Sequence, residues 1–443
     1  MDPVRTRVSL LSLHAGCDGA NTAAPRRELH NDCDTCPSPT CPQTIRRPAW
    51  PAIRGGAAAM SRDLRLVSIS LLAWGFGEAL FFYLIPLYLA ELGADPAWIG
   101  GILGLAGLAM MLTHIPAGAL ADRLGSRKLM IAGWASGLLA AVLMFVSRSL
   151  VPFVGGLLLY HFTSFVMAPL NRYITAARQH WSTARALTSV SAMFNLGGVV
   201  GAAAGGLIAE HLGTRANFGL ASLAFLFSSL MVLLTREHPL QENRSRRPAL
   251  GLLRSSAFSR VTGLAFFSMF ALYLSWPLTP NYLRQVHQVP LTQIGLFGAL
   301  NALGMVILNL TLGGANALSG LLASQLLVAA SILALWQGSA AVWFGMGYFL
   351  AGGFRVARNL ILALSEQVAP PDRLGAAYGL METAGALSLV LAPPVAGLLF
   401  QRHPALPYPA SLILIACAMF FAARFQQRSS PQAPQPPDPA NRR

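Results

Sequence analysis

The sequence predicts an all-α membrane protein in which twelve transmembrane helices form two pseudo-symmetric six-helix bundles. Three observations support this fold class: the composition, the spacing of apolar runs and an internal repeat. Of the 443 residues, 54% are hydrophobic and only 11% are charged, with a mean hydropathy of +0.53. Soluble domains carry about 25% charged residues, so this composition indicates a chain embedded in lipid.

The net charge of +15 would also suit a protein that binds nucleic acid. Such proteins gather their basic residues in a patch or stripe, whereas the arginines here stand singly between apolar runs. Cytoplasmic loops of membrane proteins carry an excess of Lys and Arg. We therefore expect the lipid bilayer as a partner, and no nucleic acid.

Apolar runs long enough to cross a bilayer, which takes about 20 residues, follow one another from Met60 onward. The predicted spans are residues 64–91, 97–119, 128–147, 150–173, 187–210, 216–235, 257–283, 292–312, 317–336, 340–365, 374–400 and 406–424. Loops on one side carry Arg123, Arg127, Lys128, Arg178, Arg185, Arg236, Arg244, Arg246, Arg247, Arg254 and Arg373. Loops on the other side carry only Arg148, Arg215, Arg284 and Arg402. This asymmetry predicts a multi-pass protein of the cell (inner) membrane with both termini in the cytoplasm.

The regions outside the spans differ from them in composition. Residues 1–59 are polar and lack the apolar core of a signal peptide, so we expect a disordered extension or a start assigned too early. In that region Cys33 and Cys36 form a CxxC that no second pair completes into a zinc site. The sequence therefore predicts no metal and no cofactor. Residues 426–443 are expected to form a disordered tail.

A polar linker, residues 237–256, separates an N-terminal bundle (60–236) from a C-terminal bundle (257–425). The two bundles repeat each other, because PLYLAELGADP from Pro86 matches PNYLRQVHQVP from Pro280. Farther along, four residues match four others in the same order: Gln179, Arg185, Met193 and Gly197 against Gln367, Arg373, Met381 and Gly385. Two matches in one order indicate a duplicated six-helix unit.

The loop between the second and third spans carries the most specific motif. GALADRLGSRK, residues 118–128, is similar to the G-x-L-A-D-R-x-G-R-K pattern of the major facilitator superfamily of transporters. The fifth span contains GGVVGAAAGG, which resembles the glycine-rich element of proton-coupled exporters in that family. Its matching glycines are Gly197, Gly201, Gly205 and Gly206. Small residues at this spacing let helix backbones approach closely, so we expect them to serve in helix packing.

The resemblance implies two six-helix bundles related by an axis along the membrane normal, with the substrate bound near the bilayer midplane. Transport would proceed by rocking between outward-open and inward-open states. The charged loop would then act as a conformational gate, made of Gly118, Asp122, Arg123, Gly125, Arg127 and Lys128. In this family's pattern the aspartate contacts the start of span 11, which here is near residues 372–375, where the helix dipole is positive.

A first prediction follows for the carboxylate of Asp122. Asp122→Asn removes the charge that holds this latch, so the variant is expected to be made in normal amount and to transport poorly. Initial transport rates, normalised to the amount of protein, test this. Unaltered transport rates would rule out a latch formed by the Asp122 carboxylate.

Charged residues inside the spans are candidates for the site, because charge within the membrane is costly. Glu78 lies near the middle of span 1. A carboxyl group that is withdrawn from water takes up a proton more readily, so Glu78 is predicted to carry the coupling proton or to bind a cationic solute. The alternative is a carboxyl group that only bonds to a neighbouring helix.

Arg355 and Arg358 lie at positions i and i+3 of span 10, and Glu382 lies just inside span 11. The arginines would bind an anionic group, pair with Glu382, or snorkel to the lipid headgroups. His161 in span 4 would titrate near neutral pH or serve as a packing histidine. Residues predicted to line the cavity are Trp74, Tyr83, Tyr160, Tyr273, Trp276 and Asn301, with the interfacial belt or helix packing as the alternative for the aromatic ones.

No enzyme signature is found, and the absence of a GxxxxGK[ST] loop argues against energy from ATP bound by this chain. The main hypothesis is a monomeric secondary active transporter of a small organic solute, an antiporter that exports its solute in exchange for protons. Two alternatives remain. One is uptake of an organic anion or sugar through Arg355 and Arg358, and the other is a non-transporting receptor on the same fold.

Overall fold

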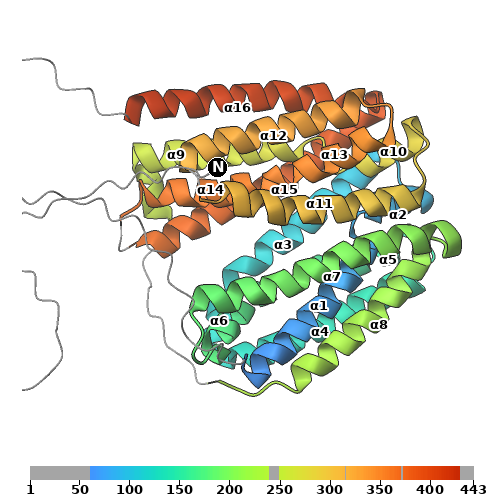
Figure 1. Cartoon of the computed structure of the whole chain (residues 1–443), viewed down its shortest axis with the longest axis vertical. Coiled ribbons are helices and arrows are strands. Elements are labelled where there is room, and N and C mark those ends of the chain that lie inside the picture. The colour runs from blue at the N-terminus through green and yellow to red at the C-terminus, as the bar shows by residue number, and fades with distance from the viewer. Residues whose placement is uncertain (1–59, 239–248, 315, 371–372, 430–443) are drawn as a thin grey trace, which may run out of the picture. The chain divides into compact units, whose positions relative to one another are not determined.

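A computed structural model describes residues 60–238, 249–314, 316–370 and 373–429, and these segments are helical (Figure 1). The N-terminal half contains α1 (Arg62–Phe82), α2 (Ile85–Glu91), α3 (Pro96–Leu124), α4 (Ser126–Val146), α5 (Leu150–Phe162), η1 (Thr163–Val166), α6 (Met167–Ala177), α7 (Thr183–Leu212) and α8 (Thr214–Leu233). The C-terminal half contains η2 (Ala249–Arg254), α9 (Ser256–Tyr273), α10 (Thr279–Val286), α11 (Leu291–Leu312), α12 (Ala317–Gln337), α13 (Ala341–Ala351), α14 (Gly353–Glu366), α15 (Leu374–Arg402) and α16 (Pro407–Ser429). Of the segments predicted to be disordered, residues 1–59 and 430–443 lie outside the described residues, whereas residues 426–429 are the last residues of α16.

The predicted fold class is confirmed. Within the described residues, ten helical segments are long and apolar enough to cross a membrane. The predicted spans 257–283 and 340–365 are formed by broken helices, α9 with α10 and α13 with α14. Proline lacks the N–H that a continuous helix needs, which explains the break at Pro277. Together these segments give the twelve crossings.

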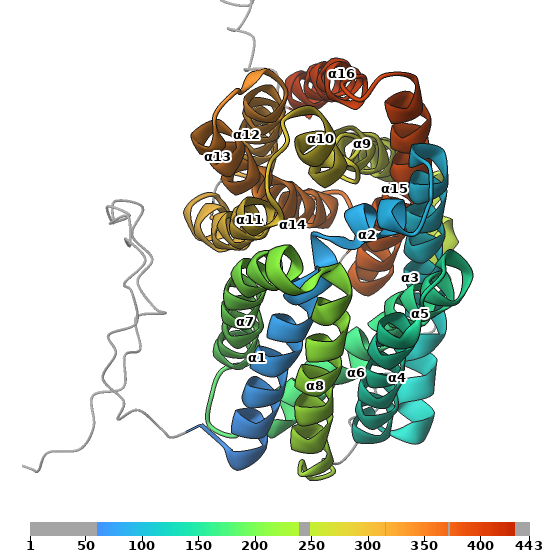
Figure 2. The same cartoon turned by 90° about the vertical axis from the view of Figure 1, so that its right-hand side faces the viewer.

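The helices run alternately between two sides of the bundle. We call the side where α1 and α4 begin the near side, and the side where α2 ends and α11 begins the far side. Within the N-terminal half, α1 packs between α7 and α8 (Figure 2). The two halves meet along two helix pairs, α3 with α15 and α7 with α11.

Hydrogen bonds join the two halves at the far side. At the far side, the Asn281 side chain donates to the carbonyl oxygen of Pro86 over 3.0 Å. The N–H of Leu291, at the start of α11, donates to the Glu210 carboxylate on α7 over 2.5 Å. Glu210 thereby caps a helix of the opposite half, whose own N-cap residue supplies no side-chain bond. The far side is closed by these contacts.

Glycines on α7 set how closely this helix approaches its neighbours. Gly197, Gly201 and Gly205 lie on one face, and a Cβ on any of them would overlap the backbone of α1. Gly206 faces another way, against the backbone of Leu291 and Gly295 on α11. One glycine-rich element therefore packs α7 inside its own half and against the other half.

Gly201→Ala is expected to destabilise the protein, because the new methyl group would meet the carbonyl group of Phe76. Overpacking of this kind typically costs about 1–3 kcal/mol. Gly198→Ala is the matched control on the same helix, since a Cβ there has nothing within 4 Å. The thermal unfolding midpoint in detergent is expected to fall for Gly201→Ala and to stay or rise for the control. Equal midpoints for the two variants would contradict this account of the packing.

Candidate functional site

Glu78 stands between the two halves, on the face of α1 that points toward α5. Protein surrounds it deeply, and yet its side chain is partly accessible, so the residue borders an internal space. The hydroxyl group of Tyr160, on α5, lies close to the Glu78 carboxyl group. Arg355 of α14, in the C-terminal half, interacts with Glu78 electrostatically. The carboxyl group therefore lies beside a hydroxyl group of its own half and interacts electrostatically with a cation of the other half.

An aromatic cluster packs next to Glu78, between helices of the N-terminal half. The ring of Trp74, one helical turn earlier on α1, stacks on Phe225 of α8 with 4.2 Å between the ring centroids. The same ring lies 6.4 Å from Tyr160 and 5.1 Å from Trp134. Aromatic rings in contact bury large apolar surfaces. The cluster therefore stabilises the packing of α1 and α5 around Glu78 and Tyr160.

Tyr83 and Asn301 were predicted to line the cavity, and the structure places them in a contact between the halves. Both side chains are buried, at 8% and 2% exposure. The Tyr83 hydroxyl donates to the Asn301 Oδ1 over 3.2 Å, and the Asn301 Nδ2 donates to the carbonyl oxygen of Tyr348 over 2.7 Å. This chain of bonds links the end of α1 to α11 and α13 in the far-side-closed state.

The two arginines of α14 have different surroundings. Arg358 forms an ion pair with Glu382 of α15, the pairing that the sequence left open. Arg355, three residues earlier, is exposed although it lies deep within the protein. Its guanidinium group makes no ion pair or hydrogen bond with any residue that the structure describes. One cation is therefore held in an ion pair, whereas the other interacts with the Glu78 and Glu382 carboxylates only electrostatically among the described residues.

Other aromatic candidates surround the same space or pack beside it. Tyr273, at the end of α9, is partly exposed and lies 5.6 Å from the ring of Phe354, the neighbour of Arg355. Trp276 is also partly exposed and packs 5.0 Å from Tyr348. His161 places its Nδ1 3.1 Å from the carbonyl oxygen of Leu157 in its own helix, a contact that suits a packing histidine.

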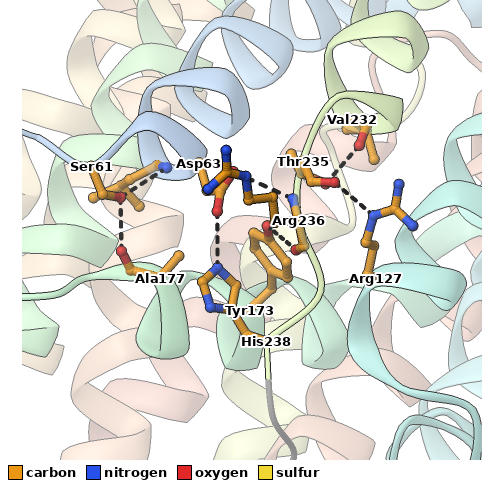
Figure 3. A network of polar contacts seen from close by, with 10 residues as sticks. Ser61, Asp63, Arg127, Tyr173, Ala177, Val232, Thr235, Arg236 and His238 are labelled. Carbon is orange, nitrogen blue, oxygen red and sulfur yellow. Dashed lines mark hydrogen bonds and ion pairs between the residues drawn. The ribbon is translucent and has the colours of Figure 1, made fainter.

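The structure describes only part of the predicted conformational gate. The side chains of Gly118, Asp122 and Arg123 lie outside the described residues, so the latch stays a prediction. Gly125 is the single residue between α3 and α4, and its φ of 87° suits glycine. Arg127 donates to the carbonyl oxygen of Thr235, just after α8, over 2.8 Å (Figure 3). It also donates to the carbonyl oxygen of Leu233, the last residue of α8, over 3.0 Å. Lys128 is exposed.

Sequence reasoning missed a polar network at the near side, shown in Figure 3. The carboxylate of Asp63, in the first turn of α1, lies 3.1 Å from the His238 Nε2 and accepts a bond from the Arg236 N–H over 3.3 Å. The Tyr173 hydroxyl of α6 donates to the Arg236 carbonyl oxygen over 2.7 Å. These contacts fasten the segment after α8 to α1 and α6. A buried acid at a helix start is the only local signal that points to this network.

Comparisons with known proteins agree with this architecture. A sequence model of the Major Facilitator Superfamily matches residues 67–264 and 261–442. The structure resembles that of the nucleoside transporter NupG, with 13% identity and a TM-score of 0.71 over 82% of this chain and 98% of that one. It also resembles a bacterial homolog of the human lysosomal transporter Spinster (15%, TM-score 0.64, 84% and 98%) and the POT family transporter PepTSo (12%, TM-score 0.67, 84% and 98%). A comparison with curated protein sequences returned no match.

Proposed function

Because the chain belongs to the Major Facilitator Superfamily, we propose that it is a secondary active transporter that moves a small organic solute across the membrane by alternating access, coupled to protons. The observation that carries the proposal is Glu78. It is an ionisable group near the middle of a membrane span that lies beside Tyr160 of its own half and interacts electrostatically with Arg355 of the other half. Ionisable residues in that position are functional by default in membrane proteins.

Proton coupling requires a group that binds and releases a proton as access changes. A carboxyl group in a low-dielectric space takes up a proton, and contact with water or with a cation returns it to the charged form. Glu78 meets both conditions, since it lies among aromatic rings and faces Arg355. Motion of one half against the other changes both its distance from that cation and its access to water.

The contacts that close the far side match one of the two end states of alternating access. The near side carries the arginine-rich loops, so we assign it to the cytoplasm, with both termini. The structure then corresponds to a state sealed from the outside by the Glu210–Leu291 and Asn281–Pro86 bonds. Opening to the outside requires α7 to part from α11 at the far side, and both bonds to break.

Flux in proteoliposomes tests the proposal. Purified protein is reconstituted, a pH gradient of either direction is imposed, and a panel of anionic, cationic and neutral solutes is followed into and out of the vesicles. We expect concentrative movement of at least one solute, abolished by a protonophore and absent from protein-free vesicles. If no solute moves in either direction, and cysteines placed on the two sides never exchange accessibility, the protein is a non-transporting member of the fold.

The structure bears on the two transport modes that the sequence left open. Export by proton exchange suits a cationic solute that competes with the proton at Glu78. Uptake of an organic anion requires a free cation, and with Arg358 paired to Glu382, that cation is Arg355. The free guanidinium group favours the anion.

A further inference from the structure

The two helix crossings that join the halves are built alike at the far side. In the α7–α11 crossing, a Cβ on Gly206 would lie 2.5 Å from the carbonyl oxygen of Leu291, the first residue of α11. In the α3–α15 crossing, a Cβ on Gly397 would lie 2.4 Å from the carbonyl oxygen of Pro96, the first residue of α3. Each crossing thus sets a glycine of one half against the start of a helix of the other half, as a duplicated six-helix unit predicts.

The two crossings differ in the cap at the start of the helix. Directly before α3, the carboxylate of Asp95 accepts a bond from an N–H of the first turn over 2.8 Å. Proline has no N–H, so Pro96 offers no donor to the opposite half. Directly before α11 stands Pro290, which supplies no side-chain bond, and the Leu291 N–H donates to the Glu210 carboxylate over 2.5 Å. The cap of α3 is therefore its own, whereas α11 receives its cap only while it lies beside α7.

The position that matches Glu210 in the other crossing carries no charge. Glu210 follows Gly206 by four residues on α7, and Gln401 follows Gly397 by four residues on α15. Gln401 is exposed and makes no hydrogen bond with α3 in the part of the chain that the structure describes. Hydrogen bonds to an ionised group are stronger than those between neutral groups. One crossing therefore has a charge-assisted bond that its counterpart lacks.

Close backbone packing is distributed in the opposite way. Gly100, Gly104 and Gly107 follow one another along α3, and a Cβ on any of them would overlap the backbone of α15. Among the described glycines of α7 and α11, only Gly206 and Gly295 bring these two backbones together. Close approach of backbones is what holds helices together within a membrane. The α3–α15 crossing is thus held by packing over a longer stretch, and the α7–α11 crossing depends more on its carboxylate bond.

We propose that the bond between the Glu210 carboxylate and the Leu291 N–H is a far-side lock, which holds α7 to α11 in the far-side-closed state. When it breaks, the far side opens at this crossing, with the α3–α15 crossing as the pivot. Glu210 is exposed in the closed state, so water satisfies both groups as they part and no buried polar group is left unpaired. The inference takes from the proposed function only the alternation between two end states, and it requires no particular solute and no proton.

Two matched cysteines report the two crossings. Ala202→Cys lies one turn before Gly206, and Pro393→Cys lies one turn before Gly397. Both replace buried residues whose carbonyl oxygens lie against the opposite helix. Each cysteine is placed in a background without the five native cysteines, and an impermeant maleimide is added from the far side. Because a buried thiol reacts only while its crossing is open, the labelling rate follows the open fraction even where that fraction is small.

Removal of the charge tests the acceptor end of the far-side lock. Glu210→Gln is expected to raise the labelling rate of Ala202→Cys about fivefold, since a charge-assisted bond becomes a neutral one. The labelling rate of Pro393→Cys is expected to stay unchanged. Gln401→Ala is the matched control at the equivalent position, and it should leave both rates as they are.

Removal of the N–H tests the donor end. Leu291→Pro gives α11 the same first residue as α3, and proline is favoured at the first position of a helix. The preceding Pro290 already has the extended backbone that a following proline requires, with ψ at 153°. Leu291→Pro is expected to raise the labelling rate of Ala202→Cys as Glu210→Gln does. Because both variants remove the same bond, combining them should add no further rise.

Each variant is first checked for a monodisperse elution profile and a normal unfolding midpoint. An unchanged labelling rate of Ala202→Cys in Glu210→Gln would overturn the far-side lock, and so would fully additive effects of the two variants. Equal rises at Ala202→Cys and Pro393→Cys would overturn the pivot. The labelling needs no solute, and the flux experiment needs no variant of Glu210, so the two proposals fail separately.

Discussion

Glu78→Gln is expected to abolish the concentrative transport that a pH gradient drives, while solute exchange between two equilibrated compartments continues. Glutamine keeps the size of the side chain, but it cannot carry a proton between the two sides of the membrane. Accumulation in proteoliposomes under an imposed gradient should fall to the level of protein-free vesicles. Counterflow of labelled solute, which needs only the conformational change, should remain within a few fold of the wild type.

Glu237→Gln provides the control, because Glu237 is an exposed acid at the near side, away from the internal space. It should accumulate solute as the wild type does. Loss of both accumulation and counterflow in Glu78→Gln would mean that Glu78 holds the solute or the structure, and that the proton travels elsewhere.

Gly206→Leu is expected to hold the far side open and to slow transport by at least tenfold. A Cβ at this position would overlap the carbonyl group of Leu291 and the backbone of Gly295, where α7 crosses α11. The helices can accommodate leucine only by parting, which also pulls Glu210 from the start of α11. The far-side-closed state is thereby disfavoured, and a transporter confined to one end state turns over slowly.

Cysteine labelling measures this shift. Asn281→Cys, in a background without the five native cysteines, replaces a buried residue of the far-side contact that is 1% exposed. An impermeant maleimide added from the far side should label it faster in the Gly206→Leu background. Gly198→Leu is the control, since a Cβ there meets nothing within 4 Å. Equal labelling in both backgrounds would show that the crossing does not govern opening.

The fold could be predicted from the sequence because the membrane imposes simple rules on a chain. A run of about 20 apolar residues is long enough to cross the membrane, and an excess of arginine marks the loops on its cytoplasmic side. The helix breaks were not predicted, because the apolar run over residues 340–365 continues through Gly352 and Gly353. Whether two glycines interrupt a helix depends on the neighbour, and here the backbone of Gly304 on α11 lies against Gly352.

The charged residues of the candidate site could be picked out from the sequence, but their partners could not. Glu78 and Arg355 stand out because an ionisable residue in an apolar run is rare. Spacing along α14 could not tell which of its two arginines would be paired, because that depends on the position of Glu382 on another helix. Tyr83 was assigned to a cavity wall on its residue type, and only the approach of α11 turns it into a contact between the halves.

The link between α3 and α4 consists of Gly125 alone. Consecutive Cα atoms are about 3.8 Å apart, so a single residue leaves these two helix ends no slack. Any displacement of α3 along α15 must carry α4 with it, and the bonds from Arg127 pass the same displacement to α8. At the near side, α3, α4 and α8 are therefore mechanically coupled, so that a displacement of α3 also displaces the other two helices.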